Sequence, residues 1–178
     1  MHRQHVGSDN PLPPVRKSVF VPLPSDAAFD LFVRRIHEWW PLAARSVFLE
    51  DAASCHAEPR VGGRLYERHR DGREETWGRF LTFEDGKRVV FTWHPGIADT
   101  SATEVEINFL PVTSETRVDV EHRHWERLGE RASFVRGIVD GGWPGILARF
   151  EALARGAEHL PAIEGPGCID RGANSSDT

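Results

Sequence analysis

The chain has 178 residues, of which 39% are hydrophobic and 28% are charged, values that are ordinary for one soluble globular domain. The formal net charge of −5 comes from both signs mixed along the chain, which argues against nucleic acid as a partner. The sequence has no apolar run long enough to span a membrane, no signal-peptide core and no cysteine spacing that suggests disulfides, so we expect a cytoplasmic protein without membrane association.

The folded domain is predicted to occupy residues 13–156. Residues 1–12 are polar and proline-rich, and we expect them to be disordered. Residues 15–21 mostly alternate between apolar and polar, as in a half-buried strand. Ser25 then stands where a helix N-cap would, and apolar residues at helical spacing follow it. This helix should end at the Trp39-Trp40 pair, because the residue before a proline avoids helical angles.

The middle of the chain is predicted to form an antiparallel meander of short strands. Turns that contain glycine separate the apolar segments, and Asp85-Gly86 is a strong hairpin signal. The later segments alternate cleanly, with apolar residues on one face and charged residues on the other, which is typical of a sheet with one wet face. The expected strands cover residues 56–58, 64–69, 75–83, 88–94, 103–109 and 116–123.

A long helix is predicted from about residue 128 to residue 155, with a kink at the glycines and proline of residues 141–145. Residues 157–178 are polar and aperiodic, so we expect a disordered tail. A sheet with one apolar face must be covered, and only this helix is long enough to cover it. The expected fold class is therefore α+β.

Seven short motifs occur in the order found in one known family. They are PSDAAFDLF (24–32), WWPL (39–42), EPRVGGR (58–64), TWG (76–78), VVFTW (89–93), EH (121–122) and GW (142–143). With them the chain resembles the START-like helix-grip superfamily, also called SRPBCC, and within it the homologues of the activator of the ninety-kilodalton heat-shock chaperone ATPase. The resemblance implies a β-α-α-β-β-β-β-β-β-α helix-grip fold, in which a curved antiparallel sheet wraps a long C-terminal helix around an internal cavity. It implies less about activity, since lipid carriers, hormone receptors and polyketide cyclases share this fold.

Aromatic residues are the main candidates for a binding site. The chain has six tryptophans but one tyrosine and one methionine. Several of the tryptophans could line the cavity and stack on an aromatic or hydrophobic ligand, or they could simply fill the core. The candidate ligand-binding residues are Trp39, Trp40, Glu58, Arg60, Trp77, Phe91, Trp93, His122 and Trp143.

The polar candidates each allow two interpretations. Glu58 and Arg60 could orient a polar end of a ligand, or they could form a salt bridge that pins the turn beside them. His122 shares strand parity with Val118 and Val120, so it should face the apolar side, as a general acid or base or as a hydrogen-bonded core histidine. His122 and His124 lack further ligands for a metal, so we expect neither a metal nor a cofactor.

The sequence therefore favours binding of a small hydrophobic molecule in an internal cavity. One alternative is an enzyme of the cyclase, aromatase or hydrolase kind, in which the same cavity folds a reactive substrate and His122 with Glu58 moves protons, although the sequence does not establish which residues are catalytic. A second alternative is a chaperone-associated interaction protein, which rests on the family resemblance alone. A homodimer is possible in each case.

Overall fold

The computed structural model describes residues 11–163. The N-terminal part begins with β1 (Val15–Val21), α1 (Ser25–Phe29), the π-helical turn η1 (Asp30–Arg34) and the 3-10 turns η2 (Ile36–Glu38) and η3 (Leu49–Asp51). The strands β2 (Ala52–Ala57), β3 (Arg64–His69), β4 (Glu74–Glu84), β5 (Arg88–Trp93), β6 (Thr103–Val112) and β7 (Glu115–Arg123) follow, with η4 (Asp99–Ser101) before β6. The turn η5 (Trp125–Arg131) then leads into the long helix α2 (Ala132–Ala154).

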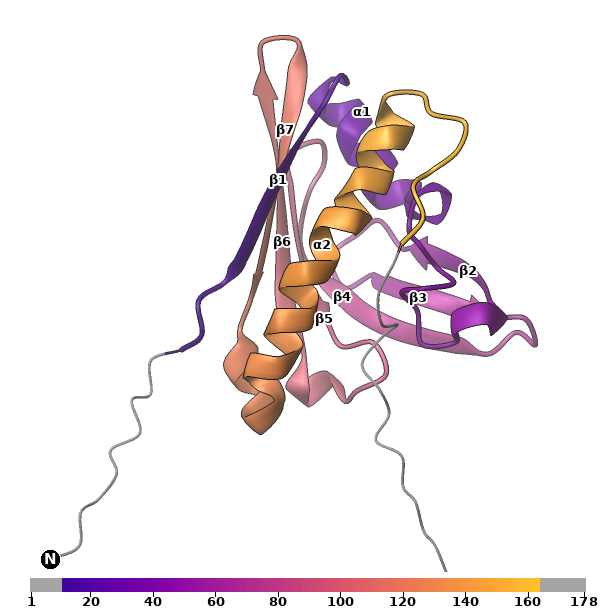
Figure 1. The fold of residues 1–178 in the computed structure, drawn as a ribbon, viewed down its shortest axis with the longest axis vertical. Helices are drawn as coiled ribbons and strands as arrows, with labels where there is room; N and C mark the ends of the chain where they lie inside the picture. Colours follow the sequence, from indigo (N-terminus) through magenta and orange to yellow (C-terminus); the bar gives the residue numbers. More distant parts are fainter. Residues whose placement is uncertain (1–10, 164–178) are drawn as a thin grey trace, which may run out of the picture.

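The strands form a single seven-stranded antiparallel sheet in the order β1-β7-β6-β5-β4-β3-β2. The sheet curves strongly: in Figure 1, β1, β6 and β7 run nearly upright, whereas β2, β3 and β4 run across the view. Helix α2 lies diagonally in front of the sheet, and α1 lies beside the upper end of α2. The predicted α+β helix-grip architecture is thus confirmed.

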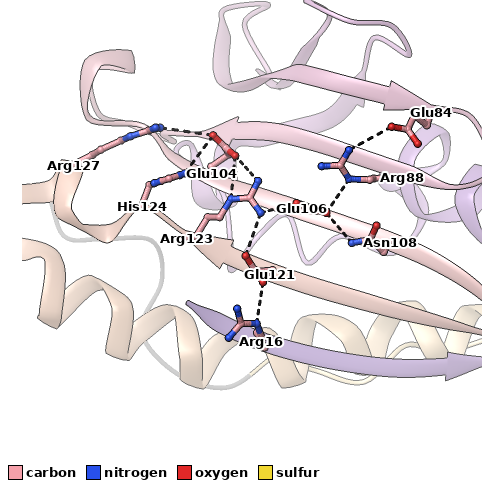
Figure 2. Close-up of polar contacts among 10 residues, drawn as sticks. All are labelled: Arg16, Glu84, Arg88, Glu104, Glu106, Asn108, Glu121, Arg123, His124 and Arg127. Carbon is pink, nitrogen blue, oxygen red and sulfur yellow. Dashed lines mark hydrogen bonds and ion pairs between the residues drawn. The ribbon is translucent and has the colours of Figure 1, made fainter. Parts of the chain in front are cut away.

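The alternation predicted for β6 and β7 is present in the structure. Val105, Ile107, Val118 and Val120 are buried on the inner face, where they meet the core. The charged residues between them face outward and contact one another in pairs and clusters (Figure 2). The inner face of these strands is therefore apolar, and their outer face is charged.

The strands from β2 to β5 pair less regularly. The register shifts between Leu65 and Tyr66 where β3 meets β4, and again between Phe80 and Thr82 where β4 meets β5. At Gly78 the two strands approach so closely that a Cβ would overlap the carbonyl oxygen of Thr92. These irregularities bend the sheet, since a bulge kinks its strand and increases the local twist.

The helices begin and end differently from the sequence prediction. Pro24 is the N-cap of α1, and Ser25 lies inside the helix with no side-chain cap bond, so the predicted role of Ser25 is wrong. Helix α2 begins at Ala132 because Gly129, at φ 57° and ψ −131°, interrupts the helical backbone. From there α2 continues as one helix through Pro144.

The described chain continues beyond α2 and packs back onto it. Leu160 contacts the hydrophobic core, and the guanidinium of Arg149 donates to the carbonyl oxygen of Pro161 at 2.7 Å. The other residues of the predicted terminal segments, 1–10 and 164–178, lie outside the described residues. Between residues 11 and 163 no helix combines the length and the apolar composition that a membrane crossing requires.

Candidate ligand-binding site

An apolar cavity lies between the inner face of the sheet and α2. Its ten lining residues come from η1, η2, β3, β4, β5 and α2 and from the Trp pair that follows η2, and all are apolar or aromatic. They are Phe32, Val33, Ile36, Trp39, Trp40, Leu65, Phe80, Phe91, Trp93 and Trp143. The volume of the cavity is about 20 Å³, which is room for about one water molecule. The side chains therefore nearly fill the space in this conformation.

Three tryptophans form the centre of the aromatic packing. The ring of Trp40 lies 5.5 Å from that of Trp77 and 5.7 Å from that of Trp93, and Trp77 and Trp93 are 5.6 Å apart. These centroid distances fall within the range of favourable tilted and edge-to-face contacts. Trp40 and Trp93 line the cavity, whereas Trp77 packs behind them. Five of the predicted binding residues, Trp39, Trp40, Phe91, Trp93 and Trp143, thus meet at one cavity.

The indole N–H groups of the lining tryptophans point to partners in the protein. Trp39 Nε1 donates to the carbonyl oxygen of Leu31 at 3.0 Å, and Trp40 Nε1 donates to that of Arg45 at 2.7 Å. A buried indole that keeps its hydrogen bond avoids the cost of an unpaired donor. The cavity wall formed by these two residues is therefore apolar.

His122 lies behind the cavity wall rather than in it. Trp143 Nε1 donates to His122 Nδ1 at 3.4 Å, and His122 Nε2 lies 2.7 Å from Oγ1 of Thr103. The imidazole is 1% exposed and packs on the ring of Trp125 at 4.4 Å. Burial lowers the pKa of His122 to about 3, because the charged form would lose its hydration. His122 is thus a neutral, hydrogen-bonded core residue, which is one of the two interpretations that the sequence allows.

Glu58 and Arg60 lie outside the cavity, at the connection between β2 and β3. Glu58 accepts a hydrogen bond from the main-chain N–H of Arg64 at 2.9 Å and lies 3.3 Å from the guanidinium of Arg60. The hydrogen bond from the Arg64 backbone, followed by the Arg64 and Arg60 charges, lowers the pKa of Glu58. The geometry matches the salt bridge that pins this turn, not a ligand contact.

A buried carboxylate that the sequence analysis did not single out lies beside the aromatic cluster. Glu67 is 0% exposed and accepts hydrogen bonds from the main-chain N–H groups of Val47 at 2.8 Å and Phe48 at 2.7 Å, and from Trp77 Nε1. It also faces Cys55 across β2 and β3, and burial, followed by the Glu67 charge, raises the pKa of that thiol to about 12. Glu67 therefore fixes the segment after Trp40 to the sheet. Glu67 lies two residues after buried Leu65 on β3 and therefore on the same face of the strand, and this spacing is the sequence signal for its inward position.

The family comparison agrees with this arrangement. The family model described as activator of Hsp90 ATPase homolog 1-like protein matches residues 23–155. The chain belongs to this family. The match confirms the resemblance of the sequence motifs, and the matched region contains all ten residues that line the cavity. No curated protein matches the chain.

Solved structures of similar fold include proteins of different kinds. An anthrahydroquino-γ-pyrone synthase, Txn09, is 36% identical to this chain. Its TM-score is 0.57, and the match covers 80% of this chain and 97% of the synthase. CalC from Micromonospora echinospora, a self-sacrificing resistance protein, is 29% identical, with a TM-score of 0.59 over 83% and 98%. The Aha1 dimer from Colwellia psychrerythraea shares the fold at 12% identity, with a TM-score of 0.58 over 83% and 100%.

Proposed function

We propose that the chain binds a flat, largely apolar aromatic molecule between the sheet and α2. The observation that carries this proposal is the cavity lined by ten apolar side chains, five of them the tryptophans and phenylalanine predicted from the sequence. Ligand sites are commonly concave and lined with hydrophobic and aromatic residues. The name of the 36% identical synthase describes a fused polycyclic aromatic product, which is a molecule of this shape.

Binding has to be coupled to opening of the cavity. A volume of about 20 Å³ is far below the roughly 300–1,000 Å³ of ordinary ligand pockets. Trp93 is only half buried, whereas the other nine lining residues are buried, so its ring has the shortest path outward. The ligand therefore selects an open form, and its apparent affinity is reduced by the rarity of that form.

A direct test uses 1,2-dihydroxyanthraquinone as the probe, with binding measured by equilibrium dialysis and by quenching of tryptophan fluorescence. We expect saturable binding at one site, and Trp93→Ala should weaken it about tenfold by removing one aromatic wall. The control is Phe134→Ala, which removes an aromatic residue of α2 that is 68% exposed and is not among the residues that line the cavity. Absence of saturable binding, or equal affinity of the two variants, would contradict the proposal.

A cyclase activity is the second candidate, and the 36% identity to a synthase favours it. No titratable side chain is among the ten lining residues, so this chain would act by holding a substrate in the folded shape that reacts. The test substrate is a hydroxyanthraquinone with a 1,3-diketone side chain beside a phenol, which closes to a γ-pyrone with loss of water. Chromatography measures the rate of ring closure, which should be higher with the protein than in buffer alone. An unchanged rate would remove this candidate. The role of a chaperone-associated protein stays a prediction from the family description.

A further inference from the structure

Two walls of the cavity are joined by a chain of hydrogen bonds that runs behind it. The first wall is the indole of Trp143 on α2, and the second is the main chain of β5 at Trp93. The chain passes from Trp143 to His122 and from His122 to Thr103, whose Oγ1 donates to the carbonyl oxygen of Trp93 at 3.1 Å. It thereby links the covering helix to the sheet across β6 and β7.

The two ends of this chain determine the direction of every bond in it. The indole N–H of Trp143 can only donate, and the carbonyl oxygen of Trp93 can only accept. His122 Nδ1 must therefore accept, which leaves the proton of the neutral ring on Nε2. The hydroxyl of Thr103 accepts from Nε2–H and gives its own hydrogen to the carbonyl oxygen. A proton on Nδ1 would place two donors against each other.

Water cannot substitute for a partner lost from the chain, because both central residues are buried. His122 is 1% exposed and Thr103 is 3% exposed. The imidazole plane is tilted by 33° to the ring of Trp125 at a centroid distance of 4.4 Å, and it meets Trp143 nearly edge-on. Packing on one side and directed hydrogen bonds on two edges leave the ring a single orientation.

We propose that His122 is a positioning residue for the ligand cavity: as the neutral Nε2–H tautomer, it holds the indole of Trp143 at a fixed place relative to β5. The inference rests on the proposed binding function, and it gives His122 a part in that function without contact to the ligand. Trp143 is the wall that α2 contributes to the cavity, so its position sets the distance between helix and sheet that a flat ligand has to fit. Rotation of the imidazole would release this wall.

The first experiment measures the tautomer in the wild-type chain by long-range ¹H–¹⁵N correlation spectra of the histidine rings at neutral pH. We expect His122 to carry its proton on Nε2 alone, and the indole N–H resonance of Trp143 to show hydrogen bonding. A proton on Nδ1, or rapid exchange between tautomers, would overturn the proposal. This measurement requires no variant and no ligand.

The second experiment removes the hydroxyl that orients His122 and compares it with a matched hydroxyl elsewhere. Thr103→Val leaves Nε2–H without an acceptor, whereas Thr116→Val removes an equally buried hydroxyl that donates to the carbonyl oxygen of Leu23 at 2.7 Å. Both variants lose one buried hydrogen bond to the main chain. With 1,2-dihydroxyanthraquinone as the probe, Thr103→Val should weaken binding about tenfold and Thr116→Val less than about twofold. Thr103→Ser keeps the hydroxyl, so its affinity for the probe should be close to that of the wild type.

The readouts separate this proposal from the proposed function. Equal losses of probe affinity in the two valine variants would show that His122 has no positioning role, even though the chain binds the probe. If the wild type fails to bind the probe, the proposed function is contradicted, and the His122 tautomer and the Trp143 indole resonance then decide whether His122 positions Trp143. A shift of that resonance in Thr103→Val, but not in Thr116→Val, supports the positioning role, and its absence overturns it.

Discussion

The two halves of the sheet differ in how regularly their strands pair. Strands β1, β7, β6 and β5 pair without a register shift, whereas every pairing between β5 and β2 contains one. In β1 and β7, and in β6 up to Phe109, inward and outward residues alternate. In the shifted half, Trp77 and Phe80, three residues apart on β4, are both buried. The sheet residues that line the cavity, Leu65, Phe80, Phe91 and Trp93, lie on β3, β4 and β5, the strands that are joined by two of the shifted pairings.

The outer face of the regular half carries a continuous set of ion pairs (Figure 2). Arg123 lies at its centre, 2.6 Å from both Glu104 and Glu106 and 3.2 Å from Glu121. Arg88 joins Glu106 from the next strand at 2.8 Å. An unbroken register places opposite charges side by side on neighbouring strands, where such cross-strand pairs stabilise a sheet. The buried polar residue of the shifted half, Glu67, is instead held by main-chain N–H groups of a loop.

The largest effect is expected where the shifted strands approach each other, in the variant Gly78→Ala. The added Cβ would overlap the carbonyl oxygen of Thr92, and a backbone atom cannot move aside as a flexible side chain can. We expect a loss of about 3 kcal/mol or more in the free energy of unfolding, measured by urea titration. Gly137→Ala is the control, since nothing lies within 4 Å of that position in α2. It should stabilise the protein by about 0.5–1 kcal/mol. Similar losses in both variants would contradict this account.

A smaller loss in the free energy of unfolding is expected for Glu67→Gln, which keeps the shape of the side chain. Both carboxylate oxygens accept hydrogen bonds, and the amide of glutamine would turn a donor toward a donor. We expect the free energy of unfolding to fall by about 2–3 kcal/mol, with faster hydrogen exchange at the main-chain N–H groups of Val47 and Phe48. Glu58→Gln at the exposed turn should change little, although Glu58 also accepts a main-chain N–H bond. Unchanged exchange at Val47 and Phe48 would show that Glu67 does not hold this segment.

The same difference between the halves explains how far the sequence could predict the structure. The inward position of His122 followed from its parity with Val118 and Val120, because β7 pairs without a shift. The partners of Glu67 could not be predicted, since Val47 and Phe48 lie in a segment without periodicity. Likewise, the sequence predicted five aromatic residues of the cavity but not its volume, which depends on how the rings tilt against one another. Alternation predicts the face on which a residue lies, whereas closeness across a bend depends on the three-dimensional packing.

The smallest effect is expected in the regular half, for Glu106→Gln on the outer face. The hydrogen bond from Arg88, aided by those from Arg123 and Asn108, lowers the pKa of Glu106 from 4.5 to about 2. The unfolded chain therefore takes up a proton near pH 4.5 that the folded chain takes up only near pH 2, so this stabilisation is complete above pH 4.5 and is lost as the pH falls toward 2.

We accordingly expect Glu106→Gln to cost about 1 kcal/mol at neutral pH and low salt, measured by urea unfolding, because surface ion pairs are screened by solvent. The difference from the wild type should shrink both in high salt and on acidification below pH 4.5. Glu84→Gln is the matched control, since Glu84 meets Arg88 at a longer 3.4 Å and is half exposed, and its effect should be smaller. A cost of Glu106→Gln that is independent of salt and pH would mean that packing, rather than charge, stabilises the regular half of the sheet.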